Sequence, residues 1–265
     1  MTEDILNKIY AAKAIHLEED MRREPYETVR DRALASIATR RPFLSALQAQ
    51  SGSAIIAEIK RASPSAGLIA RDFDPVAIAN IYQGAGVDAV SVITEADHFL
   101  GELAFLPQVR AAIDKPLLRK DFLTTRYEVA QSAAYGADCI LLIVSGLTDA
   151  QIRECLAEAR AYQLDVLVEV HDENQLQRAL QFGVDFVGVN NRNLRTMITD
   201  LAVSEYVLPQ VPQDVFAISE SGMRNLEDLE RLRRAGARGF LIGEALMRAD
   251  DPAELIRSLK RVYAH

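Results

Sequence analysis

Hydrophobic residues along this chain recur in short runs of strand length, separated by longer stretches with helical periodicity. The clearest run, Ala54 to Ser65 (AIIAEIKRASPS), ends in charge, Ser and Pro, which is typical of a buried strand that enters a loop. Side chains alternate along a strand, so Ile56, Glu58 and Lys60 share one face. The pattern predicts a carboxylate and an ammonium side by side at a strand exit. For such a pair alone, a solvated salt bridge is the simpler interpretation.

One sequence signature, a helix that ends at Gly followed by a short turn and a buried strand, occurs four times. The copies are GAGVDAVSVI from Gly84, AYGADCILLI from Ala134, QFGVDFVGVN from Gln181 and RAGARGFLIG from Arg234. They recur about every 50 residues, and a strand–helix unit of a barrel takes roughly 30 residues. Each interval therefore holds two units, which predicts eight in all.

The strands between these copies are expected at three further apolar runs, Pro116–Lys120, Asp165–Val170 and Val215–Ser219. With strands starting at Ala54, Ala89, Cys139, Phe186 and Gly239, they make eight. Helices are expected at Pro75–Gln83, Leu103–Ala112, Arg126–Tyr135, Asp149–Tyr162, Glu173–Gln181, Leu201–Val207, Leu226–Ala235 and Pro252–Tyr263. This alternation predicts an α/β protein, a single (β/α)8 TIM barrel over residues 54–265. An open doubly wound sheet is the alternative, but no G-x-G-x-x-G motif follows the first strand.

Residues 1–50 precede the barrel and form one domain with it in this interpretation. Helices are expected from Ile5 to about Asp20 and from Tyr26 to Ser36, with Pro25 at the break and Pro42 as a stop. We expect this helical extension to pack over the barrel mouth.

Composition excludes several classes of protein. With 49% hydrophobic and 26% charged residues, the chain is typical of a globular protein. No apolar stretch reaches the roughly 18 residues of a membrane span, and Glu3 and Asp4 are unlike a signal peptide, so we expect a cytoplasmic protein without a membrane partner. The net charge of −8 argues against nucleic acid, but allows a site for an anionic small molecule. Cys139 and Cys155 lack metal-type spacing and are expected to be buried free thiols.

Candidate chemistry gathers where the predicted strands end, which is where barrel enzymes build their active sites. Taken singly, each charged residue there could equally form a structural ion pair. Six ionisable side chains at one mouth favour function. The candidates are Glu58, Lys60, Lys120, Phe122, Glu169, Asn190, Arg192, Glu220 and Ser221.

Gly222 and Gly243 follow the last two strands, where barrels often bind phosphate through backbone N–H groups. Ser63 or Ser65 would add a hydroxyl group. Either glycine alone is also explained as a turn residue. Glu244 is repulsive to a phosphate unless its side chain turns away.

Several segments, in order along the chain, resemble the indole-3-glycerol phosphate synthase family of tryptophan biosynthesis, in its single-activity form. They are AEIKRASPS from Ala57, SVITE from Ser91, LLRKDF from Leu117, VEVHDENQL from Val168, VGVNNRNL from Val187, ISESGM from Ile218 and LIGEALM from Leu241. The resemblance implies a lyase that closes an indole ring on a carboxyphenylamino-deoxyribulose phosphate, with loss of CO₂ and water, and needs no redox or metal cofactor. It also implies a phosphorylated small-molecule partner, and we expect a monomer or weak homodimer.

The resemblance assigns roles by position. Lys120 matches the general acid, and Lys60, Glu58 and Glu169 match the acid and base of dehydration, with their individual roles open. Substrate-positioning groups match Asn190, Arg192, Glu220 and Ser221, the aromatic contact matches Phe122, and the phosphate site matches Ser63, Gly222 and Gly243, beside Glu244. Two alternatives remain: a lysine Schiff-base aldolase using Lys60 or Lys120, and a non-catalytic barrel that binds a phosphorylated metabolite.

Overall fold

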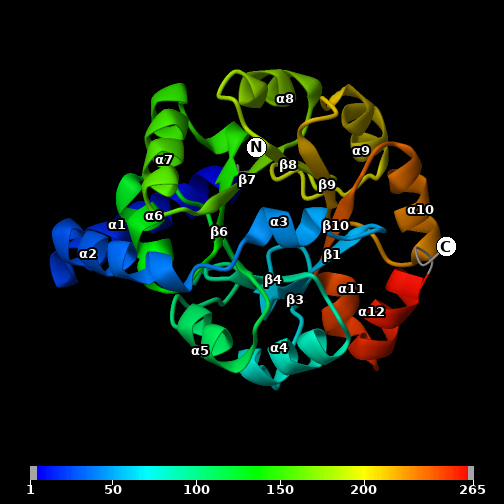
Figure 1. Cartoon of the computed structure of the whole chain (residues 1–265), viewed down its shortest axis with the longest axis horizontal. Helices are drawn as coiled ribbons and strands as arrows, with labels where there is room; N and C mark the ends of the chain where they lie inside the picture. Colours follow the sequence, from blue (N-terminus) through cyan, green and yellow to red (C-terminus); the bar gives the residue numbers. More distant parts are fainter. Residues whose placement is uncertain (1–4, 262–265) are drawn as a thin grey trace.

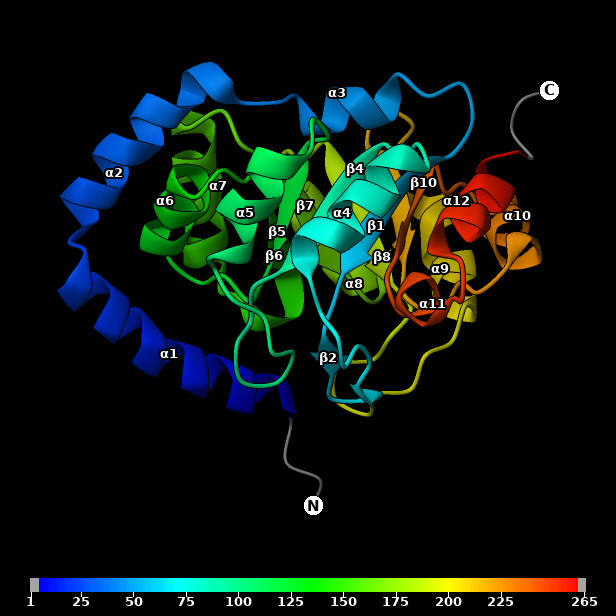
Figure 2. The same ribbon diagram turned by 90° about the horizontal axis from the view of Figure 1, so that it is seen from below.

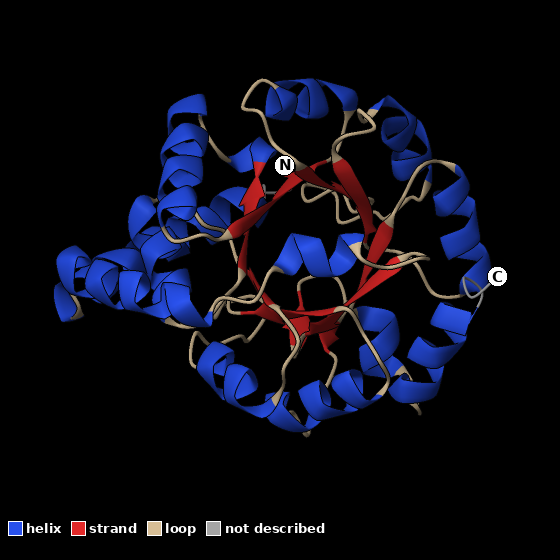
Figure 3. Ribbon diagram, in the orientation of Figure 1, coloured by secondary structure: helices blue, strands red, loops and turns tan. Residues whose placement is uncertain are grey.

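The computed structural model describes residues 5–261, and within them eight parallel strands close into a barrel (Figures 1 and 3). The (β/α)8 prediction is confirmed. The barrel order is β1-β10-β9-β8-β7-β6-β5-β4, and β4 pairs back to β1. The barrel strands are β1 (Ala54–Ile59), β4 (Ala89–Ile93), β5 (Leu117–Lys120), β6 (Cys139–Ile143), β7 (Asp165–Val170), β8 (Phe186–Asn190), β9 (Phe216–Glu220) and β10 (Gly239–Ile242).

Helices surround the strands as the periodicity predicted, with ends that shift by up to two residues. In five of these helices an Asp, Thr or Asn side chain at the N-cap accepts a hydrogen bond from the first turn, and the Thr125 cap of α6 forms a capping box with Glu128. The predicted end of the last helix at Tyr263 lies outside the described residues. The surrounding helices are α4 (Pro75–Gly84), α5 (Phe105–Ala112), α6 (Arg126–Ala134), α7 (Asp149–Ala161), α8 (Glu173–Leu180), α9 (Ala202–Val207), α10 (Leu226–Arg234) and α12 (Pro252–Arg261).

Short elements lie at the ends of the barrel, and the hydrophobic pattern did not predict them. A two-stranded hairpin, β2 (Ala62–Ser63) and β3 (Gly67–Leu68), follows β1, and α11 (Glu244–Arg248) follows β10. Three short 3₁₀ turns lie at Ser36–Thr39, Val144–Gly146 and Leu208–Gln210. Elements of two to five residues carry too few positions for a periodic signal.

The N-terminal extension runs from one end of the barrel to the other (Figure 2). α1 (Ile5–Arg23) lies at the end where the strands finish, α2 (Tyr26–Ala35) follows the side along α6, and α3 (Phe43–Gln48) crosses the opposite end. The extension is therefore not one cap over the mouth, because only α1 lies there. Pro42 precedes α3 and does not simply end a helix.

Two layers of core explain this path. Alternate strand residues such as Ile56 fill the barrel interior together with Phe43, Leu44 and Leu47 of α3. The α3 backbone is held there by a hydrogen bond from Leu44 N–H to Asp165 Oδ2, 2.8 Å long. The other strand face, with Ile55, packs against the helices in a separate layer. Because α3 closes the end opposite the mouth with apolar side chains, only the mouth stays open to polar groups.

Within residues 5–261, no helix combines the length and apolar character needed to cross a bilayer. Cys139 and Cys155 are buried free thiols, as predicted.

Candidate active site

A cavity of about 560 Å³ opens at the mouth of the barrel. Every predicted site residue lines it except Glu220, which lies fully buried beneath. The register explains this convergence, because Glu58 of β1 lies level with Ser91 of β4, and Asn190 of β8 lies level with Glu220 of β9. The inward positions at the ends of neighbouring strands therefore meet at one depth.

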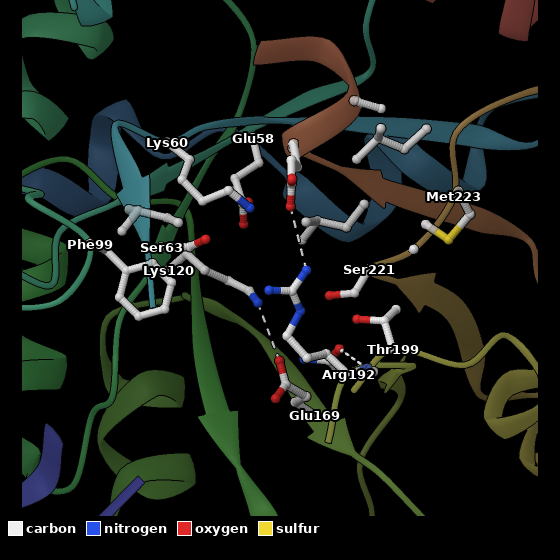
Figure 4. Close-up of a pocket in the computed structure, with 18 of the residues that line it drawn as sticks. Glu58, Lys60, Ser63, Phe99, Lys120, Glu169, Arg192, Thr199, Ser221 and Met223 are labelled. Atoms are coloured by element: carbon white, nitrogen blue, oxygen red, sulfur yellow. Dashed lines mark hydrogen bonds and ion pairs between the residues drawn. The ribbon is translucent and has the colours of Figure 1, made fainter. Parts of the chain in front are cut away.

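Lys120 stands at the centre of this site, at the end of β5. Its Nζ lies 2.9 Å from Glu220 Oε2 and 3.2 Å from Glu169 Oε2, and Figure 4 shows it pointing toward Glu169. Burial alone would lower the pKa of Lys120, but the neighbouring carboxylates outweigh burial and raise it. Lys120 is therefore held as a charged ammonium.

Glu58 and Lys60 form the ion pair that strand alternation predicted, with 2.6 Å between Glu58 Oε1 and Lys60 Nζ. Their side chains are only 6% and 12% exposed, so this is not a solvated surface pair. Burial opposes the charge on Glu58, but Lys60 and then Lys120 hold the pKa of its carboxyl below the usual range.

Glu220 and Glu169 share Lys120 but differ in charge state. Burial, with the nearby charge of Glu169, raises the pKa of Glu220 to about 7 although Lys120 opposes this shift. For Glu169, burial acts in the same direction, but Lys120 and His171 lower its pKa. Two carboxyl groups beside one ammonium thus prefer different protonation states, a pattern typical of acid–base sites.

An aromatic wall closes one side of the cavity around Phe122. Its ring centre lies 6.0 Å from that of Phe99 and 5.8 Å from that of Tyr10, which meets it edge to face. Phe99 also lines the cavity, yet sequence reasoning did not select it. The available signal was its position in the loop after β4, close to a predicted strand end.

The predicted phosphate side is built from the loops after β1, β8, β9 and β10. Ser63 is buried, and its Oγ accepts a hydrogen bond from Ala66 N–H at 3.2 Å. Arg192 bonds to the Ser65 hydroxyl and lies 3.6 Å from Glu244, which also pairs with Arg248 at 3.1 Å. The Glu244 charge that sequence reasoning found repulsive to phosphate is therefore matched by two guanidinium groups.

Two residues after β9 adopt left-handed backbone conformations, Ser221 with φ 64° and Gly222 with φ 88°. A side chain at Gly222 would be strained, and its Cβ would lie 2.7 Å from Thr199 Cγ2. This glycine is needed for the turn itself.

Gly243 has a role beyond the expected one. A Cβ there would overlap with Glu58 Oε1 and come within 3.0 Å of Lys60 Nζ. The glycine therefore makes room for the Glu58–Lys60 pair. A larger residue at this position would press directly on the Glu58 and Lys60 side chains.

A buried ionic network next to the cavity was missed by sequence reasoning. Asp121, between Lys120 and Phe122, bonds to Lys13 at 2.8 Å, to Arg119 at 3.0 Å and to the Thr94 hydroxyl at 2.6 Å. Lys13 belongs to α1, so the network fastens the extension to the end of β5. Burial opposes ionisation, but these cations hold the Asp121 pKa well below its usual range. Lys13 and Asp121 lie 108 positions apart in the sequence, so their pairing leaves no local pattern there.

Fold and site together define an enzyme of the (β/α)8-barrel class with acid–base groups at the carboxyl ends of its strands. The family model described as indole-3-glycerol phosphate synthase matches residues 6–259. The chain belongs to this family, which confirms the resemblance found in its sequence.

Individual proteins support the same assignment. The indole-3-glycerol phosphate synthase of Koribacter versatilis is 47% identical over 83% of this chain and 86% of its own. That of a Polaromonas species is 43% identical over 97% of this chain and 98% of its own. A crystal structure of 3-hexulose-6-phosphate synthase superposes with a TM-score of 0.61 at 20% identity, covering 80% of this chain and all of that one, which shows a shared fold alone.

Proposed function

We propose that this protein closes the indole ring of indole-3-glycerol phosphate, the product that its family's name states, from 1-(2-carboxyphenylamino)-1-deoxyribulose 5-phosphate. The observation that carries the proposal is the charged Lys120 at the base of the cavity, paired with buried carboxylates of two facing strands. Ring closure puts negative charge on a carbonyl oxygen, and a fixed ammonium stabilises and protonates that oxygen.

In the first step, the ring carbon that carries the carboxylate attacks the C2′ carbonyl carbon, and Lys120 gives its proton to the carbonyl oxygen. The carboxylate then leaves as CO₂, and its bonding electrons restore the aromatic ring. The aromatic wall of Phe122 and Phe99 supports this assignment because it offers a flat apolar surface beside Lys120.

The second step removes water. The new hydroxyl needs a proton to leave, and a carbon-bound proton next to it must be taken by a base. Lys60, Glu58 and Glu169 are the groups we assign to this exchange. The Glu58–Lys60 pair and Glu169 lie on different strands, so a bound ring between them has ionisable groups on two sides.

Binding the substrate is assigned to the remaining residues. We assign Arg192, Asn190, Ser221 and the buried Glu220 to positioning the ring and sugar chain. The phosphate is assigned to the loops of Ser63, Gly222 and Gly243, where Arg192 supplies positive charge against Glu244.

The direct test is to incubate the protein with the carboxyphenylamino-deoxyribulose phosphate and follow indole fluorescence together with CO₂ release. We expect both products in equal amounts. Absence of indole formation by folded protein would contradict the proposal.

A Schiff-base aldolase is disfavoured because its lysine must be a neutral amine to attack a carbonyl, and the pKa of Lys120 is raised. Borohydride added with a carbonyl compound should therefore leave no covalent adduct on Lys120. A non-catalytic barrel is disfavoured because every predicted acid–base residue is present and converges on the cavity.

A cytoplasmic location and a monomeric or weakly dimeric state are also part of the proposal. Sedimentation analysis over a range of protein concentrations tests the second.

A further inference from the structure

Glu95 lines the cavity, yet the proposed mechanism gives it no role. It is the last residue of the SVITE segment and follows the end of β4 in the chain. Its side chain is only 1% exposed. A buried carboxyl group beside an acid–base site is either a further reacting group or part of the framework that holds the site. The hydrogen bonds of Glu95 decide between these two roles.

Four donors from one loop occupy the two carboxylate oxygens of Glu95. Oε2 accepts hydrogen bonds from the backbone N–H groups of His98 at 2.8 Å and Phe99 at 2.9 Å. Oε1 accepts one from Asp97 N–H at 3.3 Å, and His98 Nδ1 lies 3.0 Å from it. A carboxylate offers about four lone-pair sites. Glu95 is therefore fully bonded, in contrast to the two carboxylates that share Lys120.

The same loop, residues 95–101, also closes on the backbone of Glu95. Gly101 N–H donates to the Glu95 carbonyl oxygen at 2.7 Å. A Cβ at Gly101 would lie 2.5 Å from the carbonyl oxygen of Ile93, so the closure requires glycine. Leu100 has a left-handed φ of 53°, a conformation that persists in a non-glycine residue only where surrounding contacts hold it. We call this segment the Glu95 loop.

The Glu95 loop carries Phe99, which lines the cavity (Figure 4). The Phe99 backbone is fixed on both sides, because its N–H bonds to Glu95 and its carbonyl oxygen accepts from Ala62 N–H of β2 at 3.2 Å. The Phe99 side chain lies against Phe122, with 6.0 Å between ring centres and 40° between ring planes. The Glu95 carboxylate therefore helps to set where one half of the aromatic wall stands relative to the other.

We propose that Glu95 is a positioning residue that holds Phe99 in place for the aromatic ring of the substrate. The proposal rests on the function proposed above, which supplies that ring. Without the carboxylate, three backbone N–H groups lose their acceptor and turn to water, so the loop must be ordered again each time substrate binds. Glu95 acts through Phe99 and exchanges no proton with the substrate.

The first test needs no turnover. Hydrogen exchange followed by NMR on the resting protein measures the protection of the His98 and Phe99 backbone amides. We expect both to be protected in the parent and to exchange at least about tenfold faster in Glu95→Ala, while amides of the barrel strands exchange as in the parent. If these two amides of the parent exchanged as fast as those of an unstructured peptide, the proposal would be overturned, whether or not the variant folds.

The second test is kinetic. Glu95→Ala should raise KM about tenfold and lower kcat by less than about threefold, because preorganised binding is lost while Lys120 and its partners stay in place. Glu95→Gln keeps one oxygen for the His98 and Phe99 N–H groups, so it should restore KM to within about threefold of the parent. A fall of about a hundredfold in kcat for Glu95→Gln would mark Glu95 as a reacting acid or base and overturn the positioning role.

A double-mutant cycle separates positioning of Phe99 from a general loosening of the mouth. If Glu95 acts through Phe99, KM of the double variant Glu95→Ala/Phe99→Ala should equal that of Phe99→Ala within about twofold. Two effects that multiply would show that Glu95 acts independently of Phe99, which contradicts the proposal.

Asp172→Ala is the matched control for this cycle. The Asp172 carboxylate also accepts a backbone hydrogen bond after a strand end, from Gln175 N–H at 2.8 Å, but neither residue lines the cavity. KM and kcat of this variant should stay those of the parent. An equal rise in KM would mean that loss of any such loop contact weakens binding, and the special role of Glu95 would be lost.

The two proposals fail in different ways. A parent protein without indole formation, but with protected His98 and Phe99 amides, contradicts the proposed function and leaves the geometry of the Glu95 loop supported. Indole formation with parental KM in folded Glu95→Ala contradicts the role of Glu95 alone.

Discussion

Buried carboxylates lie at both ends of this barrel, but they are bonded differently. At the closed end, Asp138 accepts hydrogen bonds from Arg41 N–H at 2.7 Å and Leu117 N–H at 2.9 Å, and pairs with Arg110. Asp88 likewise accepts from Ile55 N–H at 2.8 Å. These aspartates accept hydrogen bonds from backbone N–H groups near the starts of β1 and β5 and in the segment before α3, so they contribute to stability.

At the mouth, the two carboxylates beside Lys120 have fewer partners than they can accept. Neither carboxylate oxygen of Glu220 makes an aligned hydrogen bond within the described residues, and Glu169 Oε1 has no hydrogen-bond partner among them. Two carboxyl groups there share one lysine, Lys120. Buried charge by itself is therefore no sign of a reaction site. Incomplete satisfaction of buried charge distinguishes the mouth from the closed end.

The largest effect is expected from Lys120, the last residue of β5. Lys120→Ala removes the proposed acid at the mouth and should lower kcat at least about a hundredfold, while circular dichroism stays that of the parent. Lys115→Ala, two residues before β5 at the closed end, should leave kcat unchanged. If Lys120→Ala kept more than about a tenth of parental turnover, Lys120 is not the acid.

Asp138→Ala tests the closed end. It leaves Arg110 without its buried carboxylate and the Leu117 N–H without an acceptor, so we expect a loss of about 3–5 kcal/mol in the free energy of unfolding. Urea unfolding measures this loss. Turnover per folded molecule should match the parent, and a selective fall in kcat would mean that the two ends are not separate in function.

Glu220→Gln tests the mouth, where we expect the substitution to raise stability instead of lowering it. The folded pKa of Glu220, about 7, lies above that of an unfolded Glu, so the folded state binds more protons in between. This carboxyl group therefore costs stability progressively as pH rises from about 4.5 to 7.

We expect Glu220→Gln to unfold at a higher urea concentration than the parent at pH 8. Its free energy of unfolding should be higher by up to ~3 kcal/mol, and this difference should shrink toward zero as the pH falls to 4.5. Lys120 keeps Glu169 as its partner in this variant. A variant less stable than the parent at pH 8 would show that Glu220 is a stabilising partner like Asp138.

The smallest effect comes from one added methyl group. Gly243→Ala pushes against Glu58 at the mouth and should lower kcat about tenfold while also raising KM, because a small misplacement of acid–base groups is costly.

Gly86→Ala is the matched control at the closed end, where φ is 87° and the added Cβ meets nothing within 4 Å. It should cost about 1 kcal/mol of stability through backbone strain alone and leave kcat intact. A rise in KM with unchanged kcat in Gly243→Ala would instead favour a glycine that serves phosphate binding only.

Most of the fold and much of the candidate site could be predicted from sequence. The shared face of Ile56, Glu58 and Lys60 followed from strand alternation, and the repeated glycine signature led to the eight strands. α3 was missed because six residues after a proline carry little periodicity. Its place across the closed end depends on the apolar interior that the strands create.

The sequence by itself determined the alternation of strands and helices, because side-chain periodicity and turn residues act over only a few positions. Only the closed barrel decided which groups meet, since closure brings β5, β7 and β9 around one point. Lys120 thus meets Glu169 49 residues away, and Gly243 meets Glu58 across the β1–β10 seam.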